Sequence, residues 1–346
     1  MGENNLEKKL TINDIAQMSG VAKSTVSRYL NGGSVKDATA QKIKKIIEEN
    51  NYEPNLFARL NAKESRIIGL TVPGFNSVTT PRLVEVIVAY LKKNDYTPLI
   101  MHTENDIEEE IRCIERLKNM NVDGIMVLAT GSTKEYEEAV KTGVLNWEEN
   151  SSCILKIPIL FLGQRFPGEN SVINDDYNAG YAVGNYIGQR KFKEIYMLWV
   201  PEDDPAVGGE RRHGVIDGLM SCEKKPKEVI ETTFFYENAI ENVQKFVDHM
   251  KTPAAVVCAT DRIAFGVYKV MSEKGIRIPE EVSVVGFGDY EAGELLQPPL
   301  TTVKFDWKNW GEISAESMIQ MILGKPVSPL QVNPYEIIER KSVKEN

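Results

Sequence analysis

Short apolar runs alternate with amphipathic stretches along most of this 346-residue chain. The apolar runs have the length of buried strands, and the stretches between them place apolar residues three and four positions apart, as a helix does. This alternation predicts parallel β-sheets covered by helices. The expected strands are 67–72, 97–101, 124–129, 159–162, 172–174, 195–200, 255–259 and 283–287, and the main expected helices are 81–93, 107–120, 180–189 and 262–274.

The N-terminal part of the chain has a different pattern, which predicts three short helices. Thr11 and Asp14 have the spacing of a capping box at the start of the first helix. The second helix is expected over about 23–30, after a glycine-containing turn, and the third over about 38–50. Two short helices joined by such a turn, with a third as support, predict a helix-turn-helix.

The outward positions of the second helix carry cations and short hydroxyl side chains and no carboxylate. They are Lys23, Ser24, Thr25, Ser27 and Arg28. An ordinary exposed helix would mix Glu with Lys, whereas this surface suits contact with phosphates and base edges.

The charge distribution agrees with this interpretation. Residues 1–63 hold 10 Lys and Arg against 7 Asp and Glu, although the whole chain has a net charge of −9. A small basic head on a larger acidic body is expected when only the head meets a polyanion.

Three stretches of the head resemble the LacI/GalR family of transcriptional repressors: 11–16 (TINDIA), 21–31 (VAKSTVSRYLN) and 51–55 (NYEPN). Ala22 departs from the family, which usually has a capping serine there, and the lost cap would cost about 1 kcal/mol of helix stability. Lys36 likewise stands where a hydroxyl residue often caps the third helix. The resemblance implies that the head approaches DNA through Thr11, Ile12, Asn13, Lys23, Ser24, Thr25, Ser27, Arg28 and Asn31.

The segment that follows resembles the family's hinge, which folds as a helix on DNA and pushes a leucine into the minor groove. The resemblance implies DNA contacts from Asn55, Ala58 and Leu60, with Leu60 as the wedge. Leu60 comes one residue earlier than the leucine of the family, which turns it by about 100° around a helix. The spacing from Pro54 to Gly69 is also one residue shorter than in the family. The alternative is an ordinary linker with Leu60 packed on the body.

The remaining chain resembles a periplasmic sugar-binding protein, with two similar subdomains, three crossovers and a ligand cleft. The expected fold class is therefore a small all-α helix-turn-helix head plus an α/β body with parallel sheets. The expected divisions are a DNA-binding domain (9–57), a hinge (58–66) and an effector-binding and dimerisation domain (67–346), the last split into an N-subdomain (about 67–168 and 301–328) and a C-subdomain (about 169–300 and 329–346).

Ligands in open α/β sheets bind beyond the carboxyl ends of the strands, and sugars need bidentate polar groups and an aromatic face. Arg211 aligns with the family's effector-binding arginine. Phe235 is an alternative to Phe234 as the aromatic residue of the site. Phe234 and Trp307 could instead be core residues, and Asp261 could instead cap a helix. The candidate effector-binding residues are Ser77, Gln164, Arg211, Phe234, Asp261, Asp289 and Trp307.

The expected function is a homodimeric repressor of a carbohydrate-utilisation operon, bound to a pseudo-palindromic double-stranded operator. A sugar, either a disaccharide of the sucrose type or a sugar phosphate, would change its DNA affinity. Gly288 and Thr260 replace polar residues that the family often has in the pocket, which leaves room for a different ligand. The alternatives are control by a non-sugar ligand or by a phosphorylated carrier protein, and a carbohydrate-binding receptor without DNA binding.

The sequence lacks the features that would indicate a membrane protein, a secreted protein, a metal site or an enzyme. No apolar stretch approaches the roughly 18 residues of a membrane helix, and the N-terminus has no apolar signal core, so a cytoplasmic protein is expected. Four separated cysteines fit reduced thiols, and three histidines argue against a metal site. The motifs of nucleophilic hydrolases and of nucleotide binding are missing, so neither an enzyme nor a cofactor is expected.

Overall fold

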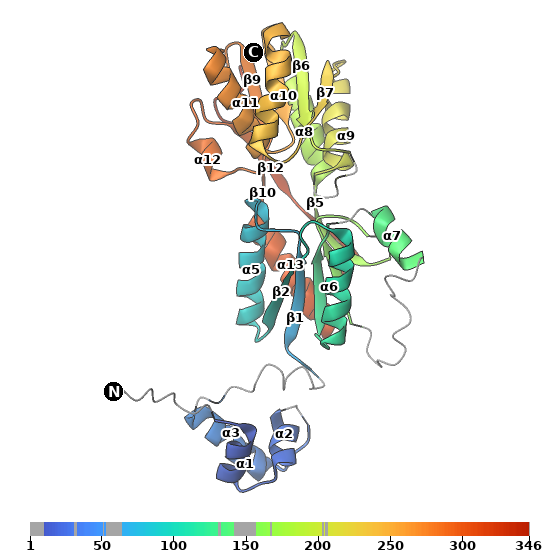
Figure 1. The fold of residues 1–346 in the computed structure, drawn as a ribbon, viewed down its shortest axis with the longest axis vertical. Helices are drawn as coiled ribbons and strands as arrows, with labels where there is room; N and C mark the ends of the chain where they lie inside the picture. The colour runs from blue at the N-terminus through green and yellow to red at the C-terminus, as the bar shows by residue number, and fades with distance from the viewer. Residues whose placement is uncertain are drawn as a thin grey trace, which may run out of the picture.

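The computed structural model consists of a helical head and an α/β body with two sheets (Figure 1). It describes residues 10–30, 33–50, 52, 64–130, 133–141, 157–166, 168–202, 204 and 207–345. None of the helices in this part of the chain is long and apolar enough to cross a membrane. The predicted fold class of a small helical head on a body with parallel sheets is confirmed.

Three helices form the head, close to the predicted bounds: α1 (Ile12–Ser19), α2 (Lys23–Leu30) and α3 (Asp37–Glu49). They bury Ile15, Val26 and Ile43 completely between them. The predicted capping box is present, because the Thr11 backbone N–H donates to Asp14 Oδ2 at 2.7 Å and the Asp14 N–H donates to Thr11 Oγ1 at 3.4 Å. Lys36 occupies the N-cap of α3 without a side-chain hydrogen bond, as the sequence implied.

The first sheet is entirely parallel in its pairings, with the order β11-β5-β4-β3-β1-β2. Its strands are β1 (Ile67–Val72), β2 (Thr97–His102), β3 (Gly124–Leu128), β4 (Ile159–Leu162), β5 (Asn170–Asn174) and β11 (Leu330–Asn333). Its helices are α5 (Thr79–Lys93), α6 (Ile107–Asn119), α7 (Thr133–Lys141) and α13 (Trp307–Ile322). We call this unit the N-subdomain.

The second sheet has the order β12-β10-β9-β8-β6-β7 and is parallel except for β12, which pairs antiparallel to β10. Its strands are β6 (Glu194–Trp199), β7 (Glu228–Glu231), β8 (Ala254–Cys258), β9 (Val282–Phe287), β10 (Thr301–Phe305) and β12 (Tyr335–Ile338). Its helices are α8 (Asp176–Gly188), α9 (Gly209–Met220), α10 (Tyr236–Phe246), the 3-10 turn η1 (Val247–His249), α11 (Asp261–Lys274) and α12 (Glu291–Glu294). We call this unit the C-subdomain.

The chain passes between the subdomains three times: from β5 to α8, from β10 to α13 and from β11 to β12. The predicted boundaries at 169, 301 and 329 each lie one strand too early. The cause is the same in all three cases, because the strand just before each crossing completes the sheet that the chain is leaving. Thus β5 and β11 belong to the N-subdomain, and β10 belongs to the C-subdomain.

Candidate functional site

The outer surface of α2 is the candidate nucleic-acid interface. Lys23, Ser24 and Arg28 are exposed, while Thr25 and Ser27 are partly buried. Val26 anchors the helix from its inner side and is completely buried. Three of the five predicted outward positions, Lys23, Ser24 and Arg28, are therefore exposed, and the helix presents two cations and a hydroxyl group to the solvent.

The beginning of α1 carries the other described residues of the head for which DNA contacts were predicted. Thr11 and Asn13 are exposed and Ile12 is partly buried. Both the side chain and the backbone N–H of Thr11 are engaged in the capping box with Asp14. Asn31, Asn55, Ala58 and Leu60, and with them most of the expected hinge, lie outside the described residues.

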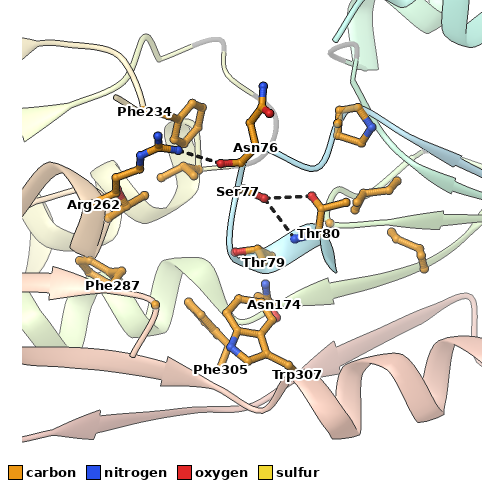
Figure 2. Close-up of a pocket in the computed structure, with 18 of the residues that line it drawn as sticks. Asn76, Ser77, Thr79, Thr80, Asn174, Phe234, Arg262, Phe287, Phe305 and Trp307 are labelled. Atoms are coloured by element: carbon orange, nitrogen blue, oxygen red, sulfur yellow. Dashed lines mark hydrogen bonds between the residues drawn. The ribbon is translucent and has the colours of Figure 1, made fainter. Parts of the chain in front are cut away.

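A cavity of about 410 Å³ lies between the two subdomains and is the candidate effector site (Figure 2). Residues at the carboxyl ends of strands from both sheets line it, including Leu128 of β3, Asn174 of β5, Phe287 of β9 and Phe305 of β10. This is the place where open α/β sheets bind ligands, and the volume is in the range of small-molecule sites.

Arg211 lines the cavity from the first turn of α9, and its side chain is only 6% exposed. Its Nε and Nη2 donate to Asp176 Oδ1 at 2.8 and 2.6 Å, and its Nη1 donates to the Ala259 carbonyl at 2.8 Å. Burial raises the pKa of Asp176, and the neighbouring guanidinium opposes that rise. The pair holds the planar guanidinium in one orientation at the cavity wall.

The close packing of α8 on α9 brings these two partners together. A Cβ atom on Gly180 would lie 2.2 Å from the Arg211 carbonyl oxygen, and a Cβ atom on Gly214 would lie 2.1 Å from the backbone carbonyl oxygen of Tyr177. Only glycine permits this approach of two helix backbones. Asp176 on α8 therefore reaches Arg211 because of small residues along the helix contact.

Ser77, Phe234 and Trp307 also line the cavity, as predicted, and Phe235 lines it as well. Ser77 lies just before α5, and its Oγ accepts from the Thr80 N–H at 3.1 Å and donates to Thr80 Oγ1 at 3.0 Å. The ring centroids of Trp307 and Trp310 lie 5.9 Å apart, so these two side chains form a continuous aromatic surface at the cavity.

Three predicted residues are not among those that line the cavity: Gln164, Asp261 and Asp289. Asp261 is completely buried and accepts from Thr302 Oγ1 at 2.6 Å and from the Tyr290 N–H at 2.8 Å. Asp289 is paired with Arg340 at 2.6 Å. Both carboxylates follow strands as expected, but their local partners turn them away from the cavity.

Sequence reasoning missed several residues of the cavity wall. Arg262 is the second residue of α11, the helix that follows β8, and its Nη1 donates to the Asn76 carbonyl of the other subdomain at 2.8 Å (Figure 2). Asn76 itself, together with Thr79, follows β1. Their positions after strands were the available signal. The remaining missed polar and aromatic residues of the wall are Thr80, Asn105, Asn174, Thr260, Phe287, Tyr290, Phe305 and Trp310.

The described residues contain no group of three His, Cys, Asp or Glu side chains placed to hold a metal ion. Cys113, Cys222 and Cys258 are free, and burial raises the pKa of the Cys113 and Cys258 thiols. Since a raised pKa disfavours the reactive thiolate, these two cysteines have the character of core residues.

Comparison with known proteins gives matches over the head and the body. The family described as "Bacterial regulatory proteins, lacI family" matches residues 11–55, and the "Periplasmic binding protein-like domain" matches residues 187–343. A sucrose operon repressor of Staphylococcus xylosus is 34% identical over 312 residues, covering 90% of this chain and 93% of that protein.

Two further proteins are similar over nearly the whole chain. The HTH-type transcriptional repressor PurR of Vibrio atlanticus (strain LGP32) is 29% identical over 340 residues, covering 96% of this chain and 98% of that protein. The crystal structure of the lac repressor dimer, bound to operator and the anti-inducer ONPF, has a TM-score of 0.82 at 24% identity. That match covers 97% of this chain and 99% of the other and shows the shared fold.

Proposed function

Since the chain belongs to the LacI family of bacterial regulatory proteins, we propose that it is a DNA-binding repressor of a carbohydrate-utilisation operon. The head binds the operator, and a sugar in the cavity changes the affinity of that binding. The similarity to a sucrose operon repressor supports a sugar as effector. The cavity supports it too, because aromatic faces and bidentate polar groups are what sugars require.

The protein acts as a cytoplasmic homodimer in this proposal. Two heads related by twofold symmetry bind two half-sites, so the operator is a pseudo-palindrome. The acidic body is repelled by DNA, which leaves the heads as the parts that meet it.

One observation carries the DNA-binding part of the proposal: the outer face of α2 exposes Lys23, Ser24 and Arg28, and its sequence contains no carboxylate. Arg28 is exposed in the last turn of this helix. An arginine in that position can bind a guanine edge or a phosphate through its fork of donors.

The test is selection of duplexes from a random library by the full-length protein, followed by titration of the enriched duplex with Arg28→Ala. We expect a pseudo-palindromic sequence and a loss of about tenfold or more in affinity, because one good base contact contributes about 1–3 kcal/mol. Circular dichroism checks that the variant remains helical.

Arg112→Ala is the matched control, because this arginine is 53% exposed on α6 of the body. It should bind the selected duplex like the wild type. If no duplex is enriched, or if Arg28→Ala and Arg112→Ala bind equally well, the proposed DNA-binding surface is wrong.

A further inference from the structure

The charge of the cavity wall is one-sided. Among the described residues that line the cavity there are two arginines, Arg211 and Arg262, and no aspartate or glutamate. Asp176 balances the charge of Arg211 from behind the wall. The charge of Arg262 therefore remains to be balanced.

Arg262 makes no ion pair with any residue that the structure describes. Its Nη1 donates to the Asn76 carbonyl, and its guanidinium carbon lies 5.0 Å from the centroid of the Phe235 ring. Guanidinium has five N–H donors, and the described contacts of Arg262 use one of them. The side chain is thus positioned at the cavity with most of its hydrogen-bonding capacity available.

The carboxylates closest in sequence to this part of the wall are already engaged elsewhere. Asp261 accepts from Thr302 and Tyr290, and Asp289 is paired with Arg340. Helix α5 also begins at the cavity, and its first turn contains no acidic residue. The partial positive charge of its N-terminus adds to the charge of Arg262.

We propose that Arg262 binds the phosphate group of a phosphorylated sugar, whose sugar part lies against the aromatic side chains Phe234 and Trp307 that line the cavity. This inference rests on the proposed function and narrows the effector to an anionic sugar. A phosphomonoester supplies the missing negative charge and matches the bidentate geometry of a guanidinium. Because Arg262 also contacts Asn76 of the other subdomain, the phosphate would be held where the two subdomains meet.

Calorimetric titration of the full-length protein with matched sugars tests this. The probes are sucrose and sucrose 6-phosphate, and glucose and glucose 6-phosphate. We expect the phosphorylated member of at least one pair to bind about tenfold more tightly than its neutral partner. Arg262→Gln should remove most of that difference, because the charge that distinguishes the two sugars is lost.

Glutamine is chosen because its amide retains a donor for the Asn76 carbonyl while the charge is lost. Arg277→Gln is the control, since this arginine is 70% exposed and pairs with Glu281 away from the cavity. It should behave as the wild type.

The outcomes separate this inference from the proposed function. If the neutral sugar binds at least as tightly as the phosphorylated one, or if Arg262→Gln weakens both equally, the anionic effector is wrong and a sugar-controlled repressor still stands. If no probe binds and none alters operator affinity, the sugar effector fails, and the role of Arg262 fails with it.

Discussion

At the scale of single residues, Asp261 has a structural role where its position in the sequence predicted effector binding. It follows a buried strand, as a ligand-binding carboxylate would, yet it connects the start of α11 to Thr302 and Tyr290. A Cβ on Gly286 would lie 2.3 Å from Asp261 Oδ1, so the carboxylate depends on a glycine that is distant in sequence. Arg211, whose family alignment was specific, does line the cavity. Side-chain direction depends on such long-range partners, which a single sequence does not reveal.

Asp261 should make the stability of the body depend on pH. Burial raises its pKa to about 6, whereas the unfolded chain has a value near 3.9. The folded state therefore binds the proton more tightly, and stability falls as pH rises between these values. We expect the free energy of unfolding of the wild type to fall by about 2 kcal/mol more than that of Asp261→Asn between about pH 4 and about pH 7.

Urea unfolding followed by tryptophan fluorescence measures both proteins across this range. Asp248→Asn is a control at an exposed carboxylate, whose side chain is 62% accessible. Parallel curves for the wild type and Asp261→Asn would show that the buried carboxylate titrates at an ordinary pKa.

At the scale of elements, the periodicity predicted the buried strands well and the edge strands poorly. Each of the eight predicted strands is present, whereas β7, β10, β11 and β12 were not expected. Of these four, β10 is an interior strand, while β7, β11 and β12 lie at sheet edges and are partly exposed along most of their length. Strands with one covered face and few apolar residues do not produce the continuous apolar runs of central parallel strands.

The contact between α8 and α9 is a second feature of this scale, and it predicts a large effect of a small substitution. We expect Gly214→Ala to lower the free energy of unfolding by about 3 kcal/mol or more, because the new methyl group would meet helix backbone rather than a side chain that can move. Separating the helices would also disturb the Arg211–Asp176 pair. Urea unfolding and sugar titration measure the two effects.

Gly209→Ala, in the first turn of the same helix, provides the control. Its Cβ would meet first a His213 ring atom at 3.4 Å, and that side chain is 54% exposed. Its stability should stay within about 1 kcal/mol of the wild type, since alanine is the better helix former. Equal stabilities of the two variants would mean that the helices adjust without cost.

At the scale of the whole molecule, three asparagines connect the three passages between the subdomains. Asn333 precedes one crossover, and its amide donates to Asn174 Oδ1 at 3.0 Å beside another. Asn333 Oδ1 accepts from Asn309, at the start of α13, at 2.9 Å. Because Asn174 lines the cavity, a ligand there would contact a group that is linked to every crossover. The two-subdomain organisation was predictable from the family resemblance, but this cluster required the fold.

Asn333 should therefore be needed to couple the cavity to the heads. We expect Asn333→Ala to bring the ratio of operator affinities with and without sugar close to one, where the intact protein has a coupling of about 1–3 kcal/mol. The sugar affinity itself should change less than about fivefold, since Asn333 is not among the described cavity residues. Operator titrations with and without the sugar that binds best provide the ratio.

Gln331→Ala separates coupling from general stability. Gln331 lies on the same strand, β11, but its amide donates to Ser317 of α13 within the N-subdomain. A hydrogen bond is lost in both variants, and only Asn333→Ala breaks the connection between crossovers. Reduced coupling in both would mean that β11 acts through its stability alone. Full coupling in Asn333→Ala would mean that the subdomains communicate by another route, because the crossovers would then move together without this amide.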